Sequence, residues 1–215
     1  VLFVFGRAGM LMGSLHAILE KDTRRMIAYS SVAQIGYIYM GIGLGTEAGM
    51  VAAVFHMFTH SATKALLFIS AVGLYEVSGD KKDYKSLRGA GYRNPLAGIG
   101  FSVGALSMVG FPMLAGFISK LLFATSALQS PNKMIITLIG LAVSTTLNAI
   151  YFLRLVITLY SREGDRETRG ERSAVRKSSW KLRLAVLCFI FLNLILGLKS
   201  QPIVQAIAAG LSTLE

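Results

Sequence analysis

The sequence has few of the residues on which redox and nucleotide chemistry depend. Its single cysteine, Cys188, lies in an apolar run, so the chain can form neither an internal disulfide nor a cysteine cluster for an iron–sulfur centre. No glycine-rich loop follows a predicted strand, as a nucleotide-binding site requires. We therefore expect no cofactor, no metal, and no redox or hydrolytic site in this chain.

Charged residues are also scarce. They make up 15% of the 215 residues, against 53% hydrophobic residues, and the mean hydropathy is +0.58. This composition is far from that of a soluble domain and predicts an all-α polytopic protein of the lipid bilayer. The net charge of +11 could indicate a nucleic-acid surface, but the basic residues fall in short links without interleaved aromatics. We expect no nucleic-acid partner.

Six apolar segments approach or exceed the roughly 20 residues that cross a bilayer. Each should be a helix, because backbone groups in lipid must find their hydrogen-bond partners within the segment. The chain enters the first segment at Val1 without the charged region of a signal peptide, so we expect an upstream part to be missing. Residues 1–200 form the predicted transmembrane domain, and residues 201–215 a C-terminal tail. The predicted spans are roughly 1–19, 26–44, 50–74, 95–128, 134–160 and 182–198.

The fourth segment is too long for one straight span. Its roughly 34 residues would make a rod of about 50 Å, well beyond a hydrocarbon core of about 30 Å. It also contains the stretch GFPMLAG, with Gly110, Pro112 and Gly116. Since proline removes a backbone donor and clashes with the preceding turn, we expect a helix break here, within either one broken span or a hairpin.

The distribution of basic residues favours one broken span. Lys and Arg concentrate in three links, at residues 21–25, 81–93 and 162–181. With a single crossing by residues 95–128, all three links fall on one side of the membrane, whereas a hairpin would move the third link to the other side. Because cytoplasmic loops carry the excess of Lys and Arg, we expect these links in the cytoplasm and both chain ends outside.

The third span carries three protonatable groups at four-residue steps: His56, His60 and Lys64. This spacing places them in one stripe along a helix. A lysine at the centre of a membrane costs about 2.5 to 3.5 kcal/mol on an insertion scale, so the stripe should face protein or water and suits a proton relay. Two alternatives are that the histidines only hydrogen-bond a neighbouring helix, and that His56 and His60 bind zinc, although no Glu lies between them.

Two further residues are candidates for the same relay. Lys120 follows the predicted break, where freed backbone groups can admit water and a proton. The alternative is a lysine that extends to the membrane interface. His16, with Ser14 beside it, is a weaker candidate for the polar interior, and packing is an equally good account of it.

Three motifs resemble those of one family of membrane subunits. They are DTRRMIAYSSVAQIGY at 22–37, HMFTHSATKALLF at 56–68 and GALSMVGFPMLAGFISK at 104–120. Their order and content are similar to antiporter-like subunits of respiratory complex I (NADH-quinone oxidoreductase), of Mrp-type cation/proton antiporters and of membrane-bound hydrogenases. Members normally have fourteen helices, so the resemblance implies that the six spans correspond to the ninth through fourteenth.

The resemblance implies roles for the same residues. His56, His60 and Lys64 would belong to a central hydrophilic axis, and Lys120 to a broken helix. Arg24 stands where the family usually has Lys. The family's intramembrane Glu and its first broken-helix Lys would lie upstream of Val1, so this chain would hold half of a transport pathway.

The expected function is therefore a proton-translocating subunit with other membrane subunits as partners, in a prokaryotic plasma membrane. Its complex would be either redox-driven, as an NADH-quinone oxidoreductase, or a cation/proton antiporter that could also move sodium. The alternative from another class is a non-transporting structural subunit whose polar residues only specify helix packing.

Overall fold

The structure is a computed structural model that describes residues 1–161 and 179–213. Within these ranges the regular structure is all helical, apart from an isolated bridge between Asp22 and Asp83, which confirms the predicted all-α fold. The helices are α1 (Leu2–Leu19), α2 (Thr23–Leu44), α3 (Glu47–Glu76), α4 (Ala90–Arg93), α5 (Pro95–Val109), α6 (Ala115–Leu128), α7 (Pro131–Leu159), α8 (Trp180–Leu198) and α9 (Ser200–Ser212).

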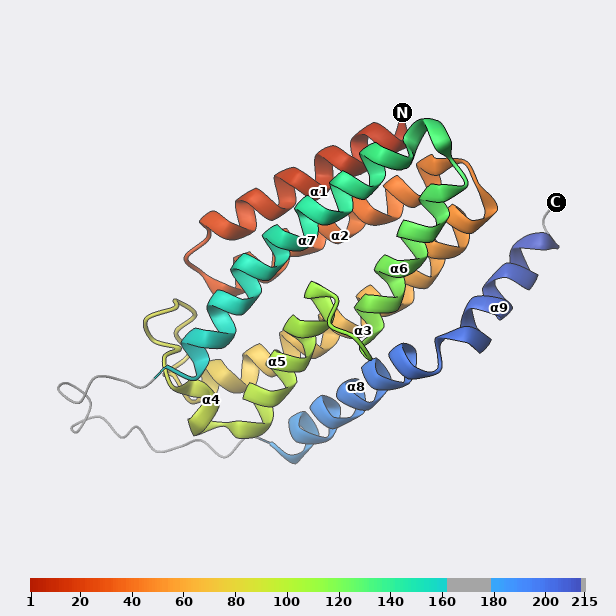
Figure 1. Ribbon diagram of the computed structural model, residues 1–215. Helices are drawn as coiled ribbons and strands as arrows, with labels where there is room; N and C mark the ends of the chain where they lie inside the picture. Colours follow the sequence, from red (N-terminus) through yellow and green to blue (C-terminus); the bar gives the residue numbers. More distant parts are fainter. Residues whose placement is uncertain (162–178, 214–215) are drawn as a thin grey trace.

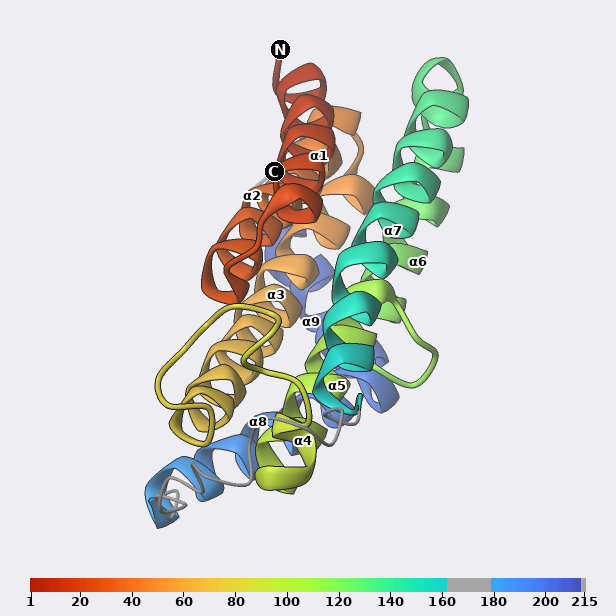
Figure 2. The same ribbon diagram turned by 90° about the vertical axis from the view of Figure 1, so that its left-hand side faces the viewer.

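The helices lie side by side in an elongated bundle (Figure 1). Helix α3 lies at its centre and contacts α2, α5, α6, α8 and α9. Figure 2 shows α1 and α2 on one side of α3, and α6 and α7 on the other. Polar groups on the inner faces of α3, such as Thr59 and Thr63, are therefore buried among other helices.

Within residues 1–161 and 179–213, four helices are long and apolar enough to cross a membrane on their own: α1, α3, α7 and α8. Helix α2 has 22 residues, enough length for a crossing, but its polar side chains Ser30 and Gln34 lower its hydropathy. Both side chains are buried inside the bundle, so they are not exposed to lipid. Helix α9 occupies the segment that we predicted only as a tail.

The fourth predicted span consists of two short apolar helices, α5 and α6. Helix α5 begins beside α4 and ends in the middle of the bundle, and α6 continues from there to the opposite end (Figure 1). The two helices thus cross the bundle once between them, with the interruption at residues 110–114. The predicted discontinuity near Pro112 is confirmed.

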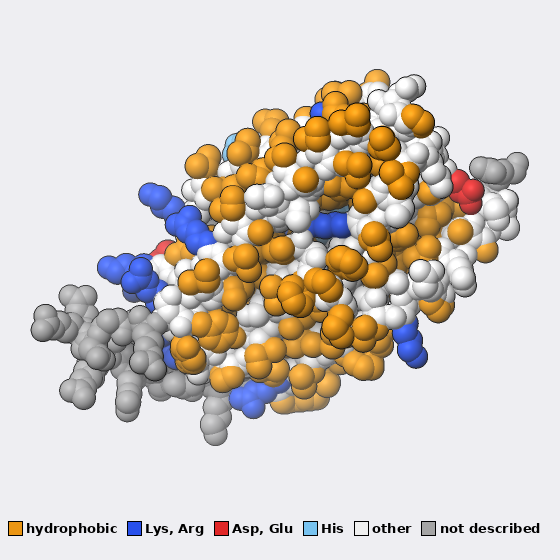
Figure 3. Space-filling view, viewed as in Figure 1, with side chains coloured by type: hydrophobic (Ala, Val, Ile, Leu, Met, Phe, Trp, Pro, Cys, Tyr) orange, Lys and Arg blue, Asp and Glu red, His pale blue; other side chains and the backbone are white. Residues whose placement is uncertain are grey.

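The basic links gather at one end of the bundle. The α1–α2 link, the segment between α3 and α4, the C-terminal end of α7 and the N-terminal end of α8 all lie there, whereas the N-terminus and α9 lie at the other end (Figure 1). Lys and Arg side chains cluster at this end in Figure 3, and apolar side chains cover most of the remaining face. Most of the third link, residues 162–178, lies outside the described residues.

Arg93 organises the link between α3 and α4. Its guanidinium donates hydrogen bonds to the carbonyl oxygens of Val77 (3.1 Å), Arg88 (3.0 Å) and Ser86 (3.3 Å), and to Oγ of Ser78 (3.1 Å). Because one rigid fork holds both ends of this link, α5 starts at a fixed position relative to the end of α3.

Glycines allow the first two helices to approach closely. A Cβ added to Gly36 would lie 2.5 Å from the carbonyl oxygen of Gly6, and one added to Gly13 would lie 2.5 Å from the backbone nitrogen of Ala33. Small residues that bring backbones together are typical of helix association in membranes. This contact fixes α2, which contributes to the polar interior described below.

Candidate functional site

A line of ionisable side chains runs inside the bundle along α3. His56 and Lys64 are only 4% and 7% exposed, and His60 is partly buried between them. The two imidazole rings stack with centroids 6.0 Å apart. The four-residue spacing read from the sequence thus produces one continuous stripe, which faces the other helices and not the lipid.

Lys64 is anchored on α2. Its Nζ donates a hydrogen bond of 2.7 Å to the carbonyl oxygen of Ile27 and a second one to Oγ of Ser30. It also lies 5.9 Å from the ring centroid of Phe152 on α7. Hydrogen bonds and a cation–π contact offset the burial of an ammonium group that has no carboxylate partner among the described residues. Packing alone does not require a lysine here, because a shorter polar group could satisfy Ser30.

Lys120 reaches the break in the broken helix. Its Nζ donates to the carbonyl oxygens of Met108 (2.9 Å) and Val109 (2.7 Å), in the last turn of α5. These carbonyls have lost their helical partners, and they carry the negative end of the α5 dipole. The interruption therefore creates a binding position for a cation inside the bundle, and Lys120 occupies it.

His56 connects the two lysines. Its Nδ1 is 2.5 Å from Oγ of Ser119, the residue before Lys120 on α6. The order along the line is Lys64, His60, His56, Ser119 and Lys120. Nε2 of His56 and Nδ1 of His60 have no hydrogen-bond partner among the described residues. Buried polar atoms of this kind are positions where ordered water is expected.

The break has a defined local geometry. Gly110 ends α5 with φ of 94°, a conformation that favours glycine, and Met113 also has a positive φ of 71°. Pro112 precedes Met113 in a turn closed by a 3.3 Å hydrogen bond from the Leu114 amide to the Phe111 carbonyl.

Helix α6 restarts against the end of α5. A Cβ at Gly116 would collide with the carbonyl oxygen of Ser107, and the Gly116 amide donates a 3.1 Å hydrogen bond to Oγ of Ser107. Glycine at this position therefore lets the first turn of α6 lie directly on α5, which brings Lys120 back to the α5 carbonyls.

His16 lies apart from this line. Its side chain is exposed on α1, where Nδ1 bonds the Met12 carbonyl (2.8 Å) and the ring stacks on Tyr29 at 5.2 Å. Its neighbour Ser14 is fully buried and faces the interior. Within the described residues, the structure thus brings together four of the five predicted relay residues and leaves His16 on the outer face.

Several polar residues that sequence reasoning missed complete the site. Ser30 and Ser119 contact Lys64 and His56 directly, as described above. A second group joins α3 to α8: Asn193 Nδ2 donates a 2.7 Å hydrogen bond to Oγ1 of Thr63, which lies 3.5 Å from Oγ of Ser107. The sequence does show hydroxyl and amide residues inside apolar spans, which could have indicated these positions. Their spacing alone cannot show which of them face the same interior of the bundle.

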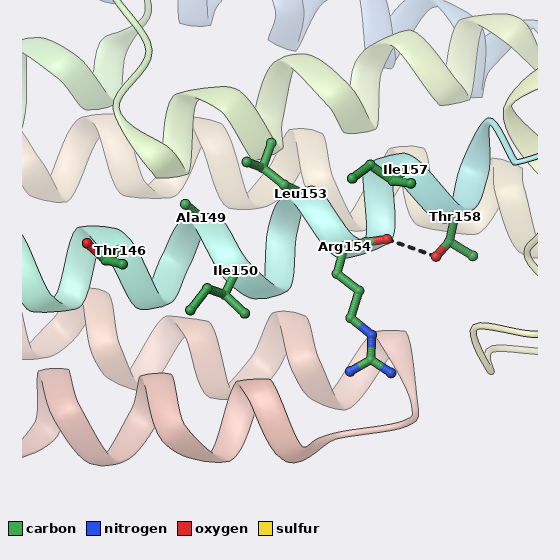
Figure 4. A pocket seen from close by; sticks show the side chains of 7 residues that line it. All are labelled: Thr146, Ala149, Ile150, Leu153, Arg154, Ile157 and Thr158. Carbon is green, nitrogen blue, oxygen red and sulfur yellow. Dashed lines mark hydrogen bonds between the residues drawn. The ribbon is translucent and has the colours of Figure 1, made fainter.

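No metal site is found in the part of the chain that the structure describes, and one surface groove lies away from the line. The described residues contain no group of three or more His, Cys, Asp or Glu that could hold a metal ion, so the spacing of His56 and His60 has no further protein ligand. A shallow groove of about 540 Å³ lies on α7 between Thr146 and Thr158 (Figure 4). Its lining is apolar apart from Arg154 and two threonines, and it shares no residue with the line.

Apolar helices that bury ionisable side chains between them define an integral membrane protein. More specifically, the chain belongs to the NADH:quinone oxidoreductase/Mrp antiporter family, whose transmembrane model matches residues 1–148.

Curated relatives and solved structures agree with this membership. The chain is 32% identical over 213 residues to NADH-quinone oxidoreductase subunit N of Desulforudis audaxviator, covering 95% of this chain and 42% of that protein. It is 28% identical over 205 residues to an Na(+)/H(+) antiporter subunit of Alkalihalophilus pseudofirmus, covering 95% of this chain and 40% of the relative. The chain thus spans about two fifths of these relatives.

The fold is similar to that of a chain in the Mrp complex from Dietzia sp. DQ12-45-1b, with a TM-score of 0.84 at 24% identity. The match covers 96% of this chain and 45% of that one. At this level of identity, the likeness supports the fold alone.

Proposed function

We propose that this chain is part of a proton-translocating membrane subunit, in which protons move between Lys120 and Lys64 through His56, His60 and water. The observation that carries the proposal is the line of buried and partly buried titratable side chains from α6 to α3. The named activities of the relatives, NADH-quinone oxidoreductase and Na(+)/H(+) antiporter, support proton transport over a purely structural role. The chain itself would hold no cofactor, and electron chemistry would take place in partner membrane subunits.

The residues of the line have different tasks in this proposal. Lys64 and Lys120 hold a proton at each end, and each charge is stabilised by backbone carbonyls, as described above. His56 and His60 receive and release the proton between them, since imidazole can do both through its two nitrogens. Ser119 orients His56 toward Lys120. The proton itself passes along hydrogen bonds, and no other covalent bond changes.

The central histidine provides the test. His56→Gln in the full-length protein keeps a group that can hydrogen-bond Ser119 but cannot hold a proton, so we expect proton transport in reconstituted vesicles to fall about fivefold or more. Met57→Leu is the matched control, because Met57 is the next residue on α3 and is exposed on the outer surface. Full transport by an assembled His56→Gln complex would refute the relay.

Two driving mechanisms fit this site. In one, a redox reaction in partner subunits drives the protons; in the other, protons exchange for sodium or another cation. The similarity to a subunit of an Na(+)/H(+) antiporter supports the exchange of protons for a cation as the second candidate mechanism. Measuring sodium movement together with proton movement, with and without NADH and quinone, distinguishes them.

The orientation of the chain is a further part of the proposal. We propose that the end of the bundle with the basic links faces the cytoplasm of a prokaryotic cell, because positive charge accumulates on that side. In a Cys188→Ser background, we expect Lys85→Cys to react with a membrane-impermeant thiol reagent only in inside-out vesicles, and Asn132→Cys only in intact cells. The opposite labelling pattern would reverse the orientation.

A further inference from the structure

Helix α7 carries a buried polar face that the relay described above does not use. Ser144, Asn148 and Tyr151 follow one another at steps of four and three residues, which places them on one side of the helix. All three are almost completely buried, whereas Val143 and Ile150 on the same helix are exposed. Burying polar groups is costly unless they are hydrogen-bonded, so this face needs a reason beyond helix packing.

Tyr151 lies next to the anchor of Lys64. Its hydroxyl donates a hydrogen bond to Oδ1 of Asn148, one turn earlier on α7. The same hydroxyl lies close to the hydroxyls of Ser30 and Ser14. Ser30 is the residue that accepts a hydrogen bond from Nζ of Lys64 and donates one of 2.8 Å to the Ile27 carbonyl. The Ser30 hydroxyl therefore lies between the ammonium group and the phenol.

The direction of the Ser30 hydroxyl depends on the charge of Lys64. A charged lysine has only donors, so Ser30 must accept from it and direct its own proton to Ile27. A neutral lysine has a lone pair, and Ser30 can then donate to it. In that state the Ser30 oxygen loses the donor it had in Lys64 and can accept a hydrogen bond from Tyr151 in its place.

Asn148 and Ser30 therefore compete for the single proton of the Tyr151 hydroxyl. We propose that Tyr151 and Asn148 are positioning residues that set how readily Lys64 releases its proton, by choosing between these two acceptors. Tyr151 turned to Asn148 favours the charged lysine, and Tyr151 turned to Ser30 favours the neutral one. Neither residue takes up the proton, which passes from Nζ of Lys64 along the line toward His60. The inference rests on the proposed relay.

The polar face also extends toward the second lysine. The hydroxyl of Tyr37 on α2 lies near Ser144, and Nζ of Lys120 is 6.0 Å from the Tyr37 ring centroid. Oγ of Ser144 and Nδ2 of Asn148 have no hydrogen-bond partner among the described residues. Such atoms are expected to bind ordered water, so a substitution at Asn148 can alter the hydrogen bonds of the other polar groups on this face.

The test uses two variants with opposite expected signs. Tyr151→Phe removes only the hydroxyl, and the ring can keep its contact with the Phe152 ring, whose centroid lies 4.7 Å from that of Tyr151. In the state with neutral lysine, the Ser30 oxygen then has no donor from Tyr151, which disfavours that state, so we expect the pH profile of proton transport to move upward by about half a pH unit. Asn148→Leu removes the acceptor that competes with Ser30 and leaves the hydroxyls of Ser30 and Ser14 near Tyr151. Tyr151 then donates to Ser30 more often, so the profile should move downward by a similar amount.

The matched control is Ser70→Ala, which removes a buried hydroxyl from α3 outside the line. Its profile should equal that of the unaltered complex. Unchanged profiles in both variants, or shifts of the same sign, would overturn the positioning role. Should Asn148→Leu fail to assemble, the upward shift of Tyr151→Phe alone decides.

The same preparations separate this inference from the proposed function. If the unaltered complex transports no protons, or if His56→Gln transports at the full rate, the relay itself is wrong. If both behave as expected while Tyr151→Phe keeps the unaltered pH profile, only the positioning role fails.

Discussion

Replacing Lys64 with arginine in the full-length protein is expected to reduce proton transport about tenfold or more while the complex remains assembled. Arginine can keep the hydrogen bonds to Ser30 and the Ile27 carbonyl, but its pKa above about 12 prevents it from releasing a proton. Lys64→Ala should be equally inactive, because it removes the proton-holding group altogether. A residue needed only for packing would give the reverse pattern, in which arginine is tolerated and alanine disrupts assembly.

Proton uptake by reconstituted vesicles, with native gel electrophoresis for assembly, measures this difference. Lys133→Arg is the matched control, since Lys133 also donates to backbone carbonyls, those of Gly43 (2.8 Å) and Leu44 (3.1 Å), but lies off the line. We expect this variant to transport normally. An active Lys64→Arg complex would end the relay role of Lys64.

Substitutions of Lys120 should affect both the stability of the complex and its proton transport, and arginine should separate the two effects. Its ammonium satisfies two carbonyls at the end of α5, and charge-assisted hydrogen bonds of this type contribute about 1 to 3 kcal/mol each before solvent screening. Lys120→Met removes both bonds but keeps most of the apolar stem, so it should lower the thermal unfolding temperature of the purified complex and reduce transport about tenfold or more. Lys120→Arg should restore the unfolding temperature, because guanidinium donors can reach the same carbonyls, but should not restore transport.

Thermal unfolding in detergent and proton uptake in vesicles are the two measurements for Lys120. If Lys120→Arg recovers both the unfolding temperature and proton transport, Lys120 acts only as a cap for the broken helix. If Lys120→Met changes neither, the lysine has no role at the break.

Several features of this protein follow from the sequence because their causes are local. Hydrophobic runs of sufficient length must become helices in lipid, whatever their neighbours. Pro112 and Gly110 break the fourth span through their own backbone geometry. The four-residue spacing of His56, His60 and Lys64 places them on one face of any helix, and the cost of an exposed ammonium in lipid directs that face inward. The all-α fold, the position of the break and most of the ionisable line were predictable for these reasons.

Only the tertiary structure decided which groups meet across the bundle. Segments far apart in the sequence meet where Lys64 pairs with Ser30 and where His56 pairs with Ser119. Lys120 meets the end of α5 across a turn whose direction the sequence does not reveal. The sequence made His16 a weaker candidate than the other histidines without excluding it, and the rotation of α1 about its axis leaves its side chain on the outside. The polar face of α7 became visible only once Tyr151 lay beside Ser30. Helix rotation and helix contacts result from the packing of the whole bundle, which a pattern within one segment cannot encode.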